Sequence, residues 1–270
     1  MRNFIRHYLL ALQFFTRIPV TGALAQWVGF SPALLRASAA HFPGVGWLVG
    51  AVAAGTYAAA VLALPAHPLS PLLAALVCTA ATVLLTGGFH EDGLADMADG
   101  LGGSSERLRA LEIMKDSRIG SFGALALVLA LLGKVTVLAL LGSISLPLVL
   151  AALWAGHVLS RFAPLVLVVF MPHVGDLAGS GSKSKPLADA MAAGRLFPAF
   201  LWCFMPLAIL YIAGGATVLI VSCGACAAAL LGLWRLLARR LQGFTGDCLG
   251  AAQQLCELAF YLGVAAAYRP

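Results

Sequence analysis

Residues 119–170 read IGSFGALALVLALLGKVTVLALLGSISLPLVLAALWAGHVLSRFAPLVLVVF and carry only two charged side chains, Lys134 and Arg161. Each half of this stretch is long and apolar enough for one helix across a bilayer, and the short segment 142–146 joins the halves. Apolar runs such as 125–132 lack the alternation of polar and apolar residues that is typical of strands in a membrane barrel. The stretch therefore predicts a helical hairpin in a membrane.

The composition extends this prediction to the whole chain. Of the 270 residues, 61% are hydrophobic and 10% are charged, and the mean hydropathy is +0.95. An ordinary soluble domain carries about 25% charged residues, so a soluble fold could not bury this much apolar surface. A disordered chain would need far more polar residues. We therefore expect an all-α, polytopic integral membrane helix bundle that forms a single membrane domain over residues 1–270.

Seven stretches have the length and composition of membrane-spanning helices. They are residues 42–64, 69–89, 119–141, 147–170, 196–213, 216–234 and 249–268. Of the 17 Lys and Arg residues, 14 fall in four connecting segments, namely 1–41, 90–118, 171–195 and 235–246. Basic residues are enriched on the cytoplasmic side of membrane proteins. The pattern predicts a multi-pass membrane protein with these four segments in the cytoplasm, and the family resemblance given below implies the bacterial inner membrane.

The N-terminal segment 1–41 is expected to hold an amphipathic helix in the membrane interface. Its apolar residues recur at helical spacing, as Phe4, Ile5, Tyr8, Leu9, Leu12 and Phe15, and its basic residues fall largely on another face. We expect Pro19 to end this helix. A cleaved signal peptide is the alternative, because Ala23–Ala25 has the spacing of a cleavage site.

Acidic residues are concentrated in one cytoplasmic segment, 90–118. Seven of the eleven Asp and Glu residues lie between Glu91 and Asp116. If the second span continues as a helix, Asp92, Asp96 and Asp99 stand at i, i+4 and i+7 and share one face. Three like charges in a weakly solvated site need a cation, and Mg²⁺ is held by a few carboxylates, water and phosphate oxygens. A solvated acidic helix face is the alternative, although such faces usually mix Lys with Glu.

The second half of this segment adds basic residues. We expect a helix that starts at Ser104 or Ser105 as N-cap. Lys115 and Arg118 would suit the neutralisation of a phosphate. Asp116 either completes the metal site or forms a salt bridge with a neighbouring base.

Two further polar features stand out. Thr245, Gly246 and Asp247 resemble a phosphate-binding turn that opens the last helix, although a plain loop explains them almost as well. Lys134 and Arg161 lie within apolar spans, where a charge is costly and therefore functional or paired inside the bundle. The Ser- and Lys-rich loop 179–185 lacks the Walker spacing and is expected to contact lipid headgroups or to add a general attraction for phosphate.

These motifs resemble the cobalamin synthase family. The resemblance runs nearly end to end and is most specific over residues 86–120, which include TGGFH at 86–90, DGLAD at 92–96, DG at 99–100 and LEIMKDSRIG at 111–120. FTRIP at 15–19, SR at 160–161 and TGD at 245–247 support it. Family members are Mg²⁺-dependent membrane enzymes that join adenosylcobinamide-GDP to α-ribazole or α-ribazole 5′-phosphate and release GMP.

The resemblance implies roles for the candidate residues. Asp92, Asp96 and Asp99 would hold Mg²⁺ on the diphosphate, with Asp116 and Glu91 as further ligands. Glu91 departs from the family pattern, in which many members have an apolar residue at this position. An Asp or His90 would accept the hydroxyl proton. The remaining candidates would bind substrate, namely Lys115, Arg118, Lys134, Arg161, Thr245, Gly246 and Asp247.

Two alternative functions stay open at this stage. One is a lipid enzyme similar to the CDP-alcohol phosphotransferases, whose aspartate pattern is related but spaced differently. The other is a cation-binding transporter, although transporters bind near the bilayer midplane and not in a cytoplasmic segment. The scattered basic residues give no indication of nucleic-acid binding. The sequence is compatible with a homo-oligomer and with contacts to other enzymes that assemble the nucleotide loop.

Overall fold

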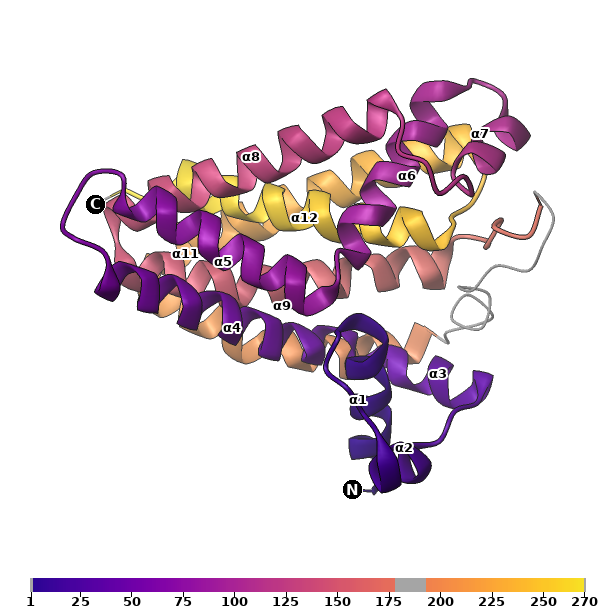
Figure 1. Ribbon diagram of the computed structural model, residues 1–270, viewed down its shortest axis with the longest axis horizontal. Coiled ribbons are helices and arrows are strands. Elements are labelled where there is room, and N and C mark those ends of the chain that lie inside the picture. The colour runs from indigo at the N-terminus through magenta and orange to yellow at the C-terminus, as the bar shows by residue number, and fades with distance from the viewer. Residues whose placement is uncertain (1, 178–192, 270) are drawn as a thin grey trace.

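The fold is a helix bundle with a smaller helical cap at one end (Figure 1). A computed structural model describes residues 2–177 and 193–269, and within these residues the only bridge between extended segments joins His173 and Phe244. The helices are α1 (Arg2–Phe15), α2 (Gly22–Val28), α3 (Pro32–Ser38), α4 (Phe42–Ala63), α5 (Ser70–Thr86), α6 (Phe89–Gly103), α7 (Arg107–Ile113), α8 (Ser121–Ile144), α9 (Leu146–Phe170), α11 (Leu196–Arg240) and α12 (Gly246–Ala267). The predicted all-α class is confirmed.

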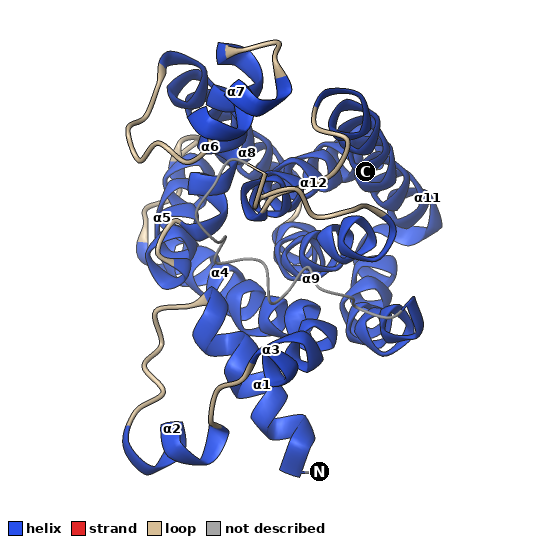
Figure 2. Cartoon of the chain, turned by 90° about the vertical axis from the view of Figure 1, so that its right-hand side faces the viewer, coloured by secondary structure: helices blue, strands red, loops and turns tan. Residues whose placement is uncertain are grey.

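Helix α9 lies at the centre of the bundle and is surrounded by α4, α11 and α12 (Figure 2). Its contact with α4 depends on small residues. A Cβ added at Gly46 would meet the backbone of His157 and Val158, and one at Gly50 would meet Trp154. Without a hydrophobic driving force between helices in lipid, close approach of this kind supplies the packing energy.

The 45 residues of α11 form a hairpin of two helical passes. Gly215 has a non-helical backbone (φ 81°, ψ 178°) and breaks it. Phe200 packs on Phe162 of α9, Gly214 lies against Leu148, and Trp234 lies near Phe170 at the other end of α9. The first half of α11 thus runs along α9 toward its N-terminal end, and the second half returns toward its C-terminal end. These two passes correspond to the predicted spans 196–213 and 216–234.

The prediction that the chain has several membrane-spanning helices is confirmed. Five helical segments are long and apolar enough to cross a membrane, and α5 with α6 forms a sixth candidate that is bent by 89°. The hairpin in α11 provides one further crossing. The predicted boundaries agree closely for α4 and α9, whereas α12 starts at Gly246, three residues before the predicted start. The protein is a multi-pass membrane protein.

The second span ends earlier than predicted. Gly87 and Gly88 both have positive φ values, 70° and 72°, and they end α5 at Thr86. Helix α6 then leaves at 89° to α5 and lies across the end of the bundle instead of continuing the span (Figure 1). A left-handed backbone at two consecutive residues is readily available only to glycine. The expectation of a continuous helix through residues 69–89 is therefore wrong.

Helix α7 also begins later than predicted. Its N-cap is Glu106, not Ser104 or Ser105. Ser104 has an extended backbone that ends α6, and its hydroxyl accepts a hydrogen bond from the Glu106 N–H at 3.1 Å. The serine therefore makes a local turn between α6 and α7.

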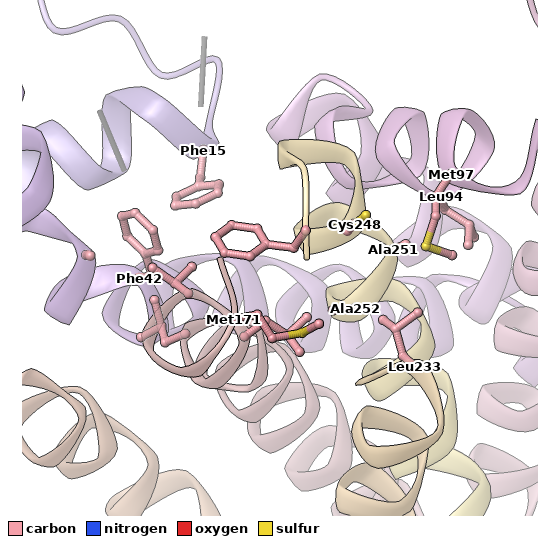
Figure 3. Packing of buried hydrophobic residues seen from close by; sticks show 14 of the residues in the cluster. Phe15, Phe42, Leu94, Met97, Met171, Leu233, Cys248, Ala251 and Ala252 are labelled. Atoms are coloured by element: carbon pink, nitrogen blue, oxygen red, sulfur yellow. The ribbon is translucent and has the colours of Figure 1, made fainter. Parts of the chain in front are cut away.

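An apolar cluster packs the cap, which consists of the short helices α1 to α3, against the bundle. It gathers Phe15 from α1, Phe42 from α4, Leu94 and Met97 from α6, and Cys248 from α12 (Figure 3). Helix α1 is amphipathic as predicted, but it ends at Phe15, before Pro19, and the backbone N–H of Arg17 then bonds to Leu85 near the end of α5. The predicted lipid-contact loop 179–185 lies outside the described residues.

Candidate active site

An acidic cavity of about 530 Å³ lies where α5 bends into α6. Its wall combines the end of α5, the first two turns of α6, the loop before α8, and Arg17 from the segment after α1. Three carboxylates line it, those of Glu91, Asp92 and Asp96. The segment predicted to carry the active site therefore lines a cavity, and its first half is the helix on which the predicted spacing depends.

Asp92 and Asp96 share this cavity, as the i, i+4 spacing predicts. Asp92 is exposed and Asp96 is half-buried. The negative charges of Asp247, Asp92 and Asp99 all act on Asp96. Burial and these charges together raise the pKa of Asp96 to about 7, and a bound cation would offset both effects.

Asp99 has a different position from the other two aspartates. It is buried, and its two carboxylate oxygens accept the N–H groups of Gly120 at 2.7 Å and Gly123 at 2.8 Å. These N–H groups lie at the start of α8, where the helix dipole favours a negative charge. The structure therefore brings two of the three predicted aspartates into the cavity and uses the third to fix α8 against α6.

Glu91 connects the cavity to the bundle. Its Oε1 accepts a hydrogen bond from Gln254 of α12 at 3.0 Å, while its Oε2 is buried and has no partner. Within the described residues, no three His, Cys, Asp or Glu side chains are already arranged as a metal site. The donor set fits a hard cation nonetheless, because carboxylates converge on one cavity and one buried carboxylate oxygen lacks a hydrogen bond.

The basic residues after α7 lie beside the cavity and not within its wall. Arg118 pairs with Asp116 at 2.6 Å, and both side chains reach solvent. Hydrogen bonds from Arg118 lower the pKa of Asp116 to about 2. Asp116 thus forms the salt bridge that was one of its two predicted roles. The charge of Lys115 acts on Asp247.

A turn at residues 245–247 opens α12, the last helix, and this turn packs against α6. Thr245 is its N-cap and accepts the N–H of Cys248 at 3.4 Å, and it donates to Asp247 at 3.2 Å. A Cβ on Gly93 of α6 would lie 2.8 Å from the Asp247 carbonyl oxygen and 3.2 Å from the Cα of Gly250. This crossing of glycines brings Asp247 next to the acidic cavity.

His90 points away from the acidic cavity. It is buried, and its ring stacks on Phe15 with centroids 5.5 Å apart. It lines a small, mainly apolar pocket of about 50 Å³ together with Arg161 and Gly246. Of the predicted proton acceptors, the structure therefore places Asp92 and Asp96, and not His90, in the acidic cavity.

Lys134 and Arg161 belong to a buried polar network inside the bundle. Lys134 lies 3.1 Å from Glu257 and 2.9 Å from the Gln254 side-chain oxygen. His157 lies 3.3 Å from the other Glu257 oxygen, and Arg161 donates to the His157 carbonyl at 2.9 Å. The prediction that Lys134 pairs within the bundle is confirmed. Lys134 is not among the residues that line the acidic cavity, and Gln254 links it to Glu91 in the cavity wall.

Sequence reasoning missed the acidic half of this network. Glu257, Gln253 and Gln254 all lie in the last span, and Gln253 donates to Glu257 at 2.6 Å. A carboxylate inside an apolar span is costly without a partner. Glu257 could have been found by applying to acids the rule that singled out Lys134 and Arg161. Arg17, in the cavity wall, was noted only as part of a motif.

Comparisons with known proteins identify the family of this chain. The family model described as cobalamin-5-phosphate synthase matches residues 7–265. The chain belongs to the cobalamin-5-phosphate synthase family. It is thus an enzyme of cobalamin biosynthesis. The acidic cavity, the start of α12 and the buried polar network all lie within the matched residues.

Curated relatives of this cobalamin-5-phosphate synthase family member cover nearly its full length. The adenosylcobinamide-GDP ribazoletransferase of Polaromonas naphthalenivorans is 62% identical, with 98% of this chain and 99% of the relative aligned. The enzyme of the same name from Albidiferax ferrireducens is 59% identical, with 98% and 99% aligned. A more distant one, from Leptothrix cholodnii, is 46% identical, with 96% and 94% aligned. No solved structure matches the chain.

Proposed function

We propose that this protein is an adenosylcobinamide-GDP ribazoletransferase that works at the acidic cavity. It joins adenosylcobinamide-GDP to α-ribazole or α-ribazole 5′-phosphate and releases GMP. The observation that carries the proposal is the pairing of Asp92 and Asp96 in one cavity of a family member. The names of the relatives supply the substrates.

The reaction is a phosphoryl transfer that leaves little covalent work to the protein. The ribazole hydroxyl oxygen forms a bond to the cobinamide-side phosphorus, and the bond from this phosphorus to the oxygen of GMP breaks. The hydroxyl proton passes to a carboxylate of the cavity, and GMP leaves with the electron pair. Catalysis then depends on positioning and on charge neutralisation.

Mg²⁺ is the cofactor that fits this donor set. Asp92 and Asp96 would hold it, with Asp247 and Glu91 close by, and it would neutralise charge on the diphosphate. Asp99 contributes by holding the start of α8 against α6. Lys115, beside Asp247, is suited to the phosphate of the leaving GMP.

The location of the cavity supports an active site at the cytoplasmic face of the inner membrane. The basic segments around α1, α6 and the end of α11 gather at one end of the bundle, and the α4–α5 loop and the C-terminus lie at the other (Figure 1). Basic residues favour the cytoplasmic side.

An assay in nanodiscs tests the proposal. Purified protein receives adenosylcobinamide-GDP and α-ribazole 5′-phosphate, with and without Mg²⁺, and GMP and the cobamide product are quantified. We expect both products in equal amounts and only with a divalent cation. Cation uptake by proteoliposomes without any GMP would contradict an enzyme and indicate a transporter. CMP release from a CDP-alcohol, with none of the expected GMP, would indicate a lipid phosphotransferase.

A further inference from the structure

Arg17 reaches the acidic cavity from a distant part of the sequence. It follows α1, and its backbone N–H donates to the carbonyl of Leu85 near the end of α5 at 2.8 Å. This bond holds the segment after α1 against the bend between α5 and α6. The side chain of Arg17 consequently forms part of the wall that Asp92 and Asp96 also line.

Gly87 provides the space that the Arg17 side chain occupies. A Cβ added at Gly87 would collide with the Nε of Arg17. Gly88 has almost the same backbone, with φ 72° against 70°, but a Cβ there would meet no atom within 4 Å. The two neighbouring glycines therefore share a backbone requirement, and only Gly87 also makes room for the arginine.

The guanidinium of Arg17 has unused binding capacity. In the described part of the chain it makes no hydrogen bond and no ion pair, and no other Lys or Arg in those residues lines the cavity. A guanidinium that stays apart from nearby carboxylates can donate its hydrogen bonds to the oxygens of a ligand instead. Its fork of N–H donors matches phosphate oxygens in pairs.

We propose that Arg17 is a substrate-binding residue that holds a phosphate of the nucleoside diphosphate group, while the carboxylates hold the cation. The inference rests on the proposed function, because it assigns a subsite for the activated substrate within the same cavity. The cavity then offers its ligand one positive and one negative part. A diphosphate carrying a divalent cation satisfies both.

Kinetics of Arg17→Gln and Arg17→Lys test the assignment. We expect Arg17→Gln to raise KM for adenosylcobinamide-GDP about 10- to 100-fold, since a hydrogen bond between charged groups is lost. KM for the ribazole substrate should stay within about twofold, and Arg17→Lys should recover part of the loss. Binding of GDP with Mg²⁺, measured by calorimetry, should weaken in parallel. An unchanged KM and an unchanged GDP affinity in Arg17→Gln would overturn the inference.

The two glycines supply a matched pair of variants. Gly87→Ala and Gly88→Ala impose the same left-handed strain, so both should lower the unfolding temperature alike. Only Gly87→Ala should raise KM for adenosylcobinamide-GDP, and adding Arg17→Gln to it should give little further effect, because both changes remove the same contact. Equal KM values in the two glycine variants would contradict the role of Arg17.

A lipid phosphate could supply the same chemistry, and the assay distinguishes the sources. Each variant is compared with wild type in nanodiscs of neutral and of anionic lipid. A substrate role predicts the same KM ratio in both, whereas a ratio that appears only with anionic lipid would show that Arg17 binds headgroups. A wild-type protein that binds Mg²⁺–GDP but releases no GMP would disprove the proposed function and leave the Arg17 site intact.

Discussion

The carboxylate of Glu257 in the buried polar network and those of the acidic cavity differ in how their charge is balanced. In the buried polar network, Glu257 contacts Lys134 and His157 and accepts hydrogen bonds from Gln253 and Tyr261. In the acidic cavity, Asp92 and Asp96 line the same wall as an Arg17 that pairs with neither.

The difference indicates which group is structural and which is functional. A buried charge with complete partners holds the fold together, and removing one partner leaves the other uncompensated. A group of like charges without partners destabilises the fold and persists where a ligand supplies the balance. Burial and pairing of a carboxylate therefore predict whether its mutation affects stability or activity.

The largest effect on activity is expected in the acidic cavity. Asp92→Asn and Asp96→Asn should each lower GMP release at least about 100-fold, because an amide keeps the size but loses the charge that holds Mg²⁺. The unfolding temperature should stay equal or rise, since repulsion is relieved. Glu112→Gln, on exposed α7, is the control and should retain near-normal turnover. Near-normal turnover in both Asn variants would show that these aspartates belong to a solvated acidic helix face and hold no cation.

The opposite result is expected for the network. Glu257→Gln should lower the free energy of unfolding by about 3–5 kcal/mol, because Lys134 stays buried without its counter-charge. Unfolding in detergent, followed by circular dichroism, measures the loss. Adding Lys134→Met should restore part of this loss. An additive double mutant would show that the pair is not coupled.

Asp99 should give an intermediate result because it combines features of both groups. Asp99→Asn keeps one acceptor oxygen for the start of α8 but loses the charge that favours the helix dipole, a change worth about 1 kcal/mol. We expect a small loss of stability and a fall in turnover well short of that in Asp92→Asn. Equal losses of turnover in the two variants would show that Asp99 acts as a cation ligand instead.

The smallest perturbation tests the side of the membrane on which the cavity lies. Ser105→Cys, at an exposed position between α6 and α7, should fold and work normally on a cysteine-free background. An impermeant thiol reagent should label it only after the cells are opened. Labelling in intact cells would place the acidic cavity outside the cytoplasm.

The sequence predicted the helices better than the positions of their side chains. Apolar length fixes where α4, α8 and α9 lie, because lipid permits few alternatives. The i, i+4 spacing likewise placed Asp92 and Asp96 together. Asp99 fits the same spacing, but its partners at Gly120 and Gly123 come from tertiary packing, which periodicity does not encode.

Arg17 and the bend at Gly87 show the same limit. Two consecutive glycines indicate a possible turn, but only the packed structure shows that the chain leaves α5 at 89° and that an arginine some 70 positions earlier occupies the space above Gly87. Glu257 is a different case, since its position in an apolar span was visible in the sequence.

Gly215 determines on which side of the membrane the last helix begins. A straight helix of 45 residues would extend about 68 Å, roughly twice the thickness of a bilayer core. If the chain crossed only once in α11, every later segment would change sides, and α12 would begin at the far surface. Asp247 would then lie a whole membrane away from Asp92 and Asp96. The break at Gly215 thus gives the chain four crossings between the cavity and α12, one in α8, one in α9 and two in α11. An even number of crossings returns the start of α12 to the side of the membrane on which the cavity lies.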